Sequence, residues 1–224
     1  MTPGQATRAG QWPVMTVVLS LLCLLARAWY GGLDPTQQRV VIEVAGANPA
    51  ELAAALANRD VAWTALGWPR LAMSLFIHSD WLHLIGNLAY LWVFGIPVER
   101  RLGPFNLALV FMLGGMLAHT IVAMQMPQLD LSVIGASGAI SAVVGAYLAL
   151  FPRRTIGLYL PLGLVVQFTR VPSLLVIGSW FTLQLVYSAL APISAAMAWW
   201  THLAGFVLGL IFALLARALA QIRA

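Results

Sequence analysis

The chain has 224 residues, of which 61% are hydrophobic and only 8% are charged, and its mean hydropathy is +0.88. This composition excludes a water-soluble globular protein, because so much apolar surface must face lipid. The net charge is +5, but the arginines do not gather on one soluble stretch, so no nucleic-acid partner is expected. The single cysteine, Cys23, excludes an internal disulfide framework.

Six apolar stretches are long enough to cross, or nearly cross, about 30 Å of hydrocarbon. They fall at about 13–29, 81–98, 105–125, 137–151, 172–190 and 199–219. A long polar connection over about 30–70 separates the first two and contains a helical-looking segment after Pro49. No repeat with a period of about 20 to 50 residues is present. We therefore predict an all-α membrane protein, a bundle of six transmembrane helices that forms one domain over residues 1–224.

Arginine is concentrated on alternate connections, and this pattern predicts the orientation. With both termini and the 2–3 and 4–5 connections in the cytoplasm, the cytoplasmic side holds eight arginines and one acid, and the outer side holds four arginines and six acids. The positive-inside rule therefore predicts a multi-pass protein of the cell (inner) membrane with both termini in the cytoplasm. A rival interpretation is a signal peptide cleaved near "ARA" at 26–28, which leaves the later topology unchanged.

Polar residues gather near the start of the second, fourth and sixth spans, which all enter the membrane from the outside. They are His78, His83, Asn87, Ser137 and His202. Polar groups in lipid are costly and usually mark function, so their convergence from three spans predicts a site just beneath the outer face. The third span carries another histidine, at position 119, without a polar companion at helical spacing, and we expect it to be structural.

The fourth span is short. From Ser137 to Phe151 the chain can form about 22 Å of helix, less than the hydrocarbon thickness of about 30 Å. If "FPRR" at 151–154 is held at the cytoplasmic surface, this helix is recessed, and "LSVIGA" at 131–136 descends beside protein or a water-filled cavity. Ser137 then begins a helix at the floor of a cavity, where free N–H groups stabilise an oxyanion. The alternative is an ordinary N-cap serine.

Small residues line one face of the fourth span and, together with His202, one face of the sixth. The two sets are Ser137, Ser141 and Gly145, and His202, Gly205 and Gly209. Such faces let membrane helices pack closely, so we expect Ser137 and His202 to come within hydrogen-bond reach, as in a base-activated nucleophile. On the second span, His83 and Asn87 share a face and offer donors for an oxyanion.

Four motifs together resemble the rhomboid family of intramembrane serine proteases. They are H-x4-H-x3-N at 78–87, "ERRLG" at 99–103, G-x-S-G at 135–138 and H-x2-G-x3-G at 202–209. The resemblance runs from Trp68, in a W-x-R segment, to about Leu210. One departure is Ser141, where family members often carry an aromatic residue that stacks under the histidine. We expect Ser141 or a neighbouring aromatic side chain to take its place.

The resemblance implies a fold, an activity and roles for the polar residues. Ser137 would be the nucleophile and His202 the base, while His83, Asn87 and the backbone of Ser137 would form the oxyanion site. The implied function is an endopeptidase that uses a Ser–His dyad to cut transmembrane segments of other membrane proteins near the outer face. Its partners would be those substrates and the lipid bilayer, and no metal or other cofactor is expected.

The resemblance also assigns residues outside the dyad. Glu99 and Arg101 would form a structural polar cluster at the cytoplasmic end of the second span. Trp180 and Phe181, in "GSWF", would be the bulky residues beside which a substrate helix enters the site sideways.

Other classes of protein were weighed against this function. A proteolytically silent relative would hold client helices, but such relatives usually lack the serine or the histidine. A transporter would carry its polar groups near the midplane of the membrane. A lipase-like hydrolase favours G-x-S-x-G, whereas residue 139 is alanine. Metallo- and aspartyl proteases are not expected, because the chain has no HExxH motif and no acid in the middle of a span.

Overall fold

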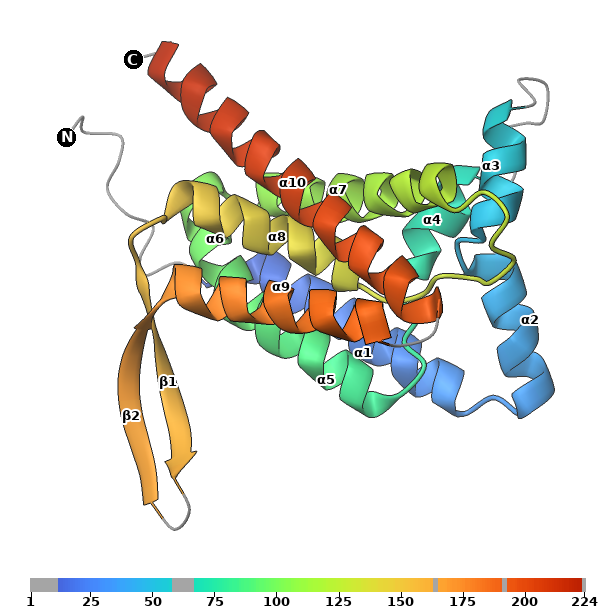
Figure 1. Cartoon of the computed structure of the whole chain (residues 1–224), viewed down its shortest axis with the longest axis horizontal. Coiled ribbons are helices and arrows are strands. Elements are labelled where there is room, and N and C mark those ends of the chain that lie inside the picture. Colours follow the sequence, from blue (N-terminus) through green and yellow to red (C-terminus); the bar gives the residue numbers. More distant parts are fainter. Residues whose placement is uncertain (1–11, 58–66, 163–164, 191–192, 223–224) are drawn as a thin grey trace.

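A computed structural model describes residues 12–57, 67–162, 165–190 and 193–222, which are mostly helical (Figure 1). The first half contains α1 (Val14–Gly31), α2 (Pro35–Ala45), α3 (Pro49–Ala57), α4 (Trp68–Ser74), α5 (Trp81–Tyr90), a π-helical turn η3 (Leu91–Gly95) and α6 (Ile96–Leu102). The second half contains α7 (Pro104–Gln125), α8 (Ser137–Leu150), β1 (Thr155–Leu162), β2 (Val165–Pro172), α9 (Ser173–Leu190) and α10 (Ile193–Ile222).

Among the described residues, four helical segments are long and apolar enough to cross a membrane. They are Val14–Gly31, Trp81–Leu102, Pro104–Gln125 and Met197–Leu219. Shorter apolar helices occupy Ser137–Leu150 and Ser173–Val186. The prediction of a largely helical, multi-pass membrane protein is confirmed, whereas the number of crossings and the recessed position of α8 remain predictions.

The expectation of an all-α chain is wrong between α8 and α9. Strands β1 and β2 form an antiparallel hairpin that pairs Thr155 with Pro172 at one end and Leu162 with Val165 at the other. Both strands contain β-branched and aromatic residues, which fit a pleated surface better than a helix, and each contains a proline that disfavours helix. No regular structure was expected for this connection.

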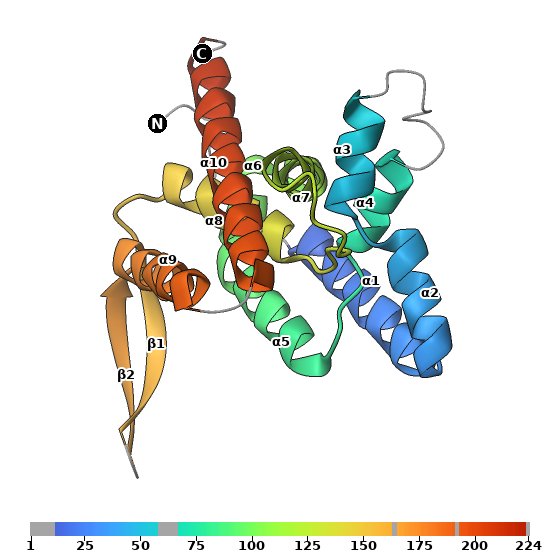
Figure 2. The same ribbon diagram turned by 45° about the vertical axis from the view of Figure 1, so that its right-hand side comes forward.

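Helix α8 is the centre of the bundle. Each of its residues from Gly138 to Tyr147 is buried, and the helix packs beside α7 and α10 (Figures 1 and 2). Small residues permit this contact: a Cβ atom on Gly114 of α7 would lie 2.4 Å from the Cβ of Ala142. Because α8 is enclosed on all sides, the position of its first residue, Ser137, is fixed.

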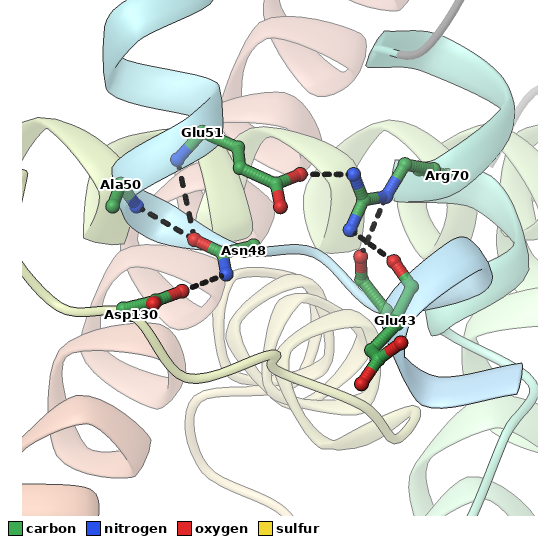
Figure 3. Close-up of polar contacts among 7 residues, drawn as sticks. Glu43, Asn48, Ala50, Glu51, Arg70 and Asp130 are labelled. Carbon is green, nitrogen blue, oxygen red and sulfur yellow. Dashed lines mark hydrogen bonds and ion pairs between the residues drawn. The ribbon is translucent and has the colours of Figure 1, made fainter. Parts of the chain in front are cut away.

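The polar connection between α1 and α5 folds back onto the segment that leads into α8. Ala47 and Val133 exchange two backbone hydrogen bonds, of 3.0 and 2.8 Å. The side-chain amide of Asn48 donates to the carboxylate of Asp130 at 2.7 Å (Figure 3). The predicted helical segment is confirmed as α3 over Pro49–Ala57, and its last residues, 58–60, lie outside the described part.

Arg70, the arginine of the W-x-R segment, ties α4 to the same connection. Its guanidinium donates to the backbone carbonyls of Gly46 and Glu43 and pairs with the carboxylate of Glu51 (Figure 3). These contacts hold α2, α3 and α4 together beside the bundle. The segment before Ser137, from Asp130 to Ala136, therefore rests against an ordered support.

Glu99 of α6 caps the start of α1. Its carboxylate accepts hydrogen bonds from the backbone N–H groups of Met15 and Thr16, both at 2.8 Å, and from the Thr16 hydroxyl at 2.7 Å. The first N–H groups of a helix lack partners within it and favour an anion. Arg101, which was expected to share a cluster with Glu99, is exposed, and within the described residues no hydrogen bond joins the two.

We predict that Glu99→Gln lowers the free energy of unfolding by about 1–3 kcal/mol, because an amide offers one acceptor oxygen and no charge to the three donors. Thermal unfolding in detergent micelles measures this difference. Arg101→Gln, on the same helix but exposed, should change the stability by less than about 0.5 kcal/mol. Equal stability of the two variants would contradict the capping role.

Candidate active site

A cavity of about 600 Å³ lies where α5, α8, α9 and α10 meet. Its polar lining includes Ser132, Ser137, His83, Asn87, Thr201 and His202. The structure thus brings to one cavity the predicted nucleophile and base and both predicted oxyanion side chains. Trp180, from the predicted entry region, also lines it.

Glycines set the separation of α8 and α10. A Cβ atom on Gly205 would lie 2.1 Å from the carbonyl oxygen of Gly138, and one on Gly209 would lie 1.8 Å from that of Ala142. No side chain fits at either position, so the two backbones are in direct contact. The predicted close packing of the fourth and sixth spans is therefore present, although α10 begins at Ile193, earlier than the predicted start near 199.

Ser137 is the first residue of α8. The N-cap position belongs to Ala136, and no side-chain hydrogen bond caps the helix. Ser137 is therefore not an N-cap serine, and the ordinary alternative fails on this geometry. The residue before the cap, Gly135, has a φ of 114°, and a Cβ atom there would lie 2.7 Å from the His83 ring. Only glycine combines this backbone angle with this contact.

The imidazole of His202 is held on two sides by α9. Its ring packs against Trp180, with centroids 5.5 Å apart, and its Nδ1 is hydrogen-bonded to the side-chain oxygen of Gln184. An amide oxygen only accepts, so Nδ1 carries the proton and Nε2 keeps its lone pair. Within the described part of the chain, Nε2 is buried and has no hydrogen-bond partner, so the hydrogen bond expected between Ser137 and His202 is not formed in this structure. A positioned imidazole with a free Nε2 is the form that a general base requires.

Ser141 occupies the position where an aromatic residue was expected from the family pattern. It is fully buried, and its hydroxyl donates to the Ser137 carbonyl at 2.8 Å. The aromatic ring beside His202 comes instead from Trp180. A ring contributed by a neighbouring helix was one of the two expected substitutes.

Gln184 was missed in the sequence analysis. It stands four residues after Trp180, so the two side chains share a face of α9. An uncharged amide within an apolar span was the signal that could have found it, because polar groups in lipid usually have a partner. What sequence alone did not supply was the rotation of α9 that turns this face toward His202.

His78 orients Asn87, one of the predicted oxyanion residues. Its Nδ1 donates to the Phe76 carbonyl at 3.0 Å, and its Nε2 accepts from the side-chain amide of Asn87 at 3.0 Å. Burial lowers the pKa of His78 to about 4, so the ring is neutral at pH 7 and Nε2 can accept. These contacts favour a structural role for His78.

His119 also has a partner from another helix. Its Nδ1 lies 3.0 Å from the Ser74 hydroxyl, at the end of α4. The carbonyl of Ser74 accepts the backbone N–H of Gly135 at 2.8 Å. His119 does not line the cavity, but this chain of contacts links it to the turn that precedes Ser137.

Aromatic side chains close the gap between α5 and α9. The Trp180 ring lies 5.4 Å from the ring of Tyr90 on α5, measured between centroids. Phe181 instead packs against Trp199 and Phe206 of α10. Trp180 therefore contacts both the opposite helix and His202, whereas Phe181 fastens α9 to α10. Among the described residues, no group of three or more His, Cys, Asp or Glu could hold a metal ion.

Comparison with known proteins gives a consistent result. Residues 65–219 match the family model described as "Rhomboid domain". Rhomboid-like protein 11, chloroplastic, of Arabidopsis thaliana is 37% identical over 73 residues, which are 33% of this chain and 26% of that protein. Rhomboid-related protein 2 of Mus musculus is 28% identical over 135 residues, 60% of this chain and 42% of that protein. Rhomboid protease GlpG of Salmonella paratyphi A is 28% identical over 160 residues, 66% of this chain and 52% of that protein. The chain spans about half, or less, of the length of these relatives.

We predict that Gln184→Leu slows the reaction of Ser137 with a fluorophosphonate by about 10- to 100-fold, because Nδ1–H loses its acceptor and the ring is no longer held. Gln184→Glu should keep most of the reactivity and move the acidic limb of the pH profile upward, since a carboxylate stabilises the imidazolium. Labelling rates measured across pH test both variants.

The control is Leu183→Ala, whose side chain is 68% exposed on the same helix. It should label at the parent rate. Parent-like labelling and an unchanged pH profile in both Gln184 variants would contradict a positioning role.

Proposed function

This chain belongs to the rhomboid family, and from this premise we propose that it is an intramembrane serine endopeptidase that cuts transmembrane segments of other membrane proteins. The observation that carries the proposal is the free Nε2 of His202, in the same cavity as Ser137. A nucleophile at the N-terminus of a helix and a positioned base in the same cavity are the minimum set of groups for acyl transfer. Neither a metal nor another cofactor is needed for it.

The reaction begins at the Ser137 hydroxyl. As its oxygen attacks the scissile carbonyl carbon, His202 Nε2 takes the hydroxyl proton. The developing oxyanion lies near the first N–H groups of α8, which have no acceptor within the helix, and near the donors of His83 and Asn87. The contact between Gln184 and Nδ1 stabilises the imidazolium that forms.

The rest of the reaction releases both products and restores the Ser137 hydroxyl and the neutral His202. The imidazolium gives its proton to the leaving amine as the carbon–nitrogen bond breaks, and an acyl ester remains on Ser137. Water then attacks the ester while His202 acts again as base, which releases the acid product and restores the hydroxyl. Only this hydrolysis consumes water, which the cavity where α5, α8, α9 and α10 meet would admit.

For this function we assign six crossings, with α8 and α9 as the two short ones, in a single domain over residues 1–224. The 14 residues of α8 rise about 21 Å, so its first residue lies below the outer surface when its last is at the inner one. The arginine distribution supports an inner-membrane orientation with both termini in the cytoplasm. Cleavage would then occur near the outer face.

A substrate helix would enter between α5 and α9. The contact of Trp180 with Tyr90 supports this route, because it is the aromatic pair that bridges the two helices beside the cavity. Phe181 would keep α9 attached to α10, and Gln184 would still hold His202, while Trp180 moves aside. Glu99, at the far end of the second span, would serve stability alone.

We predict that Ser137→Ala lowers cleavage of single-span reporter proteins in proteoliposomes by about 10³-fold or more, because no other group replaces the nucleophile. A fluorophosphonate should label the parent protein and not this variant. Ser179→Ala, an exposed serine of α9, is the matched control and should behave as the parent. Failure of the parent to label, or cleavage by Ser137→Ala, would contradict the proposed protease.

We further predict that Tyr90→Ala increases cleavage of a transmembrane reporter by about 2- to 10-fold. An aromatic pair contributes about 0.5–1.5 kcal/mol, and its loss favours the open gate by the corresponding factor. Cleavage of an unfolded water-soluble peptide, which reaches the cavity from the aqueous side, should not change.

Tyr90→Phe keeps the ring and should cleave both substrates at the parent rate. An equal increase for both substrates in Tyr90→Ala, or a loss with the transmembrane reporter alone, would refute lateral entry at this position.

A further inference from the structure

The β1–β2 hairpin leaves the helical bundle sideways. It follows the last turn of α8, at the end away from Ser137, and β2 continues into α9 without a connecting segment. Figures 1 and 2 both show it extending away from the helices, across the direction in which α9 runs. At its base Ile156 and Ser173 are buried, whereas Phe168, further out, is 51% exposed.

The hairpin is apolar and basic. Its strands read "TIGLYLPL" and "VVQFTRVP", in which Arg170 is the only charged residue. Arg153 and Arg154 immediately precede it, and the sequence has no acid after Asp130. Arg154 lies over the ring of Phe151, at 4.5 Å from its centroid, and Arg170 is exposed.

The hairpin is expected to be unstable both in water and in the hydrocarbon core of the membrane. An isolated two-stranded hairpin is marginally stable in water, where its aliphatic side chains are unfavourable. Hydrocarbon is excluded for a different reason: among the described residues the sheet has only these two strands, and the backbone groups on its outer edges would lose their hydrogen bonds to water. The membrane interface satisfies both demands, since side chains reach the acyl region while water and headgroups reach the edges. Aromatic and arginine side chains favour this interface.

We propose that the hairpin lies on the membrane surface, on the leaflet opposite the Ser137 cavity, and binds anionic lipid headgroups through Arg153, Arg154 and Arg170. When the helices stand across the membrane, an element that runs across them lies along its surface. The three cations, with no acid in the sequence after Asp130, match a negatively charged leaflet. Because β2 leads directly into α9, this contact fixes the start of the helix that carries Trp180 and Gln184.

Spin labels can measure the depth of the hairpin in the full chain. A Cys23→Ala background removes the only cysteine, and Gln167→Cys places a label on the exposed outer strand. Leu183→Cys is the lipid control and Arg100→Cys the water control, since both positions are exposed. The protein is reconstituted in vesicles of phosphatidylcholine, with or without phosphatidylglycerol. Collisions with oxygen report lipid, and collisions with a nickel chelate report water.

The proposal expects that the label at 167 in phosphatidylglycerol vesicles meets several-fold less nickel chelate than the label at 100. Changing Arg153, Arg154 and Arg170 together to glutamine should restore access to the chelate, toward the value in phosphatidylcholine alone. This readout does not depend on catalysis, so it also separates the hairpin proposal from the proposed protease.

Four results would overturn the proposal. Equal chelate access at 167 and 100 in both vesicles would place the hairpin in water. Protection that is the same in both lipids and in the triple variant would exclude headgroup binding by the arginines. Protection that requires an added single-span reporter would make the partner a substrate. Spin–spin broadening that disappears on dilution with unlabelled protein would make it a second copy of the chain.

Discussion

The backbone contact between α8 and α10 is the constraint on which the other features depend. Gly205 and Gly209 lie against the carbonyls of Gly138 and Ala142, at positions where a methyl group would overlap the opposite helix. The close packing of the two helices places His202 in the cavity that Ser137 also lines. Without hydrophobic driving force between helices in lipid, close packing of small residues is what holds such a pair together.

Groups outside this pair hold the site in one arrangement. His78 holds Asn87, Ser74 holds Gly135, and Gln184 with Trp180 holds His202. Each support comes from a different element, so the site is organised before any substrate arrives. A reactive group that is already oriented needs little reorganisation during the reaction. This preorganisation accounts for much of the rate enhancement of such sites.

Features that repeat along a single helix, or that follow from composition, could be predicted from the sequence. The apolar runs, the small faces of α8 and α10, and the gathering of polar residues near Ser137 were all legible in this way. The β1–β2 hairpin was not predicted, although every second residue of β1 from Ile156 to Leu162 is aliphatic, because β2 shows no such alternation and each strand contains a proline. The contact of Glu99 with α1 and that of Gln184 with His202 join residues from separate helices. Such contacts depend on how helices rotate about their axes, and an apolar span such as α9 carries no sequence signal for that rotation.

The most direct test of the account is the rate at which a fluorophosphonate labels Ser137 in folded Gly205→Ala, compared with Gly178→Ala. Gly178 lies on α9 with open space around it, whereas a methyl group on Gly205 must push α10 away from α8. Because a misplacement of about 1 Å can cost about 10²-fold, the account predicts labelling at least about tenfold slower in Gly205→Ala and unchanged in Gly178→Ala. Labelling of Gly205→Ala at the parent rate would contradict it.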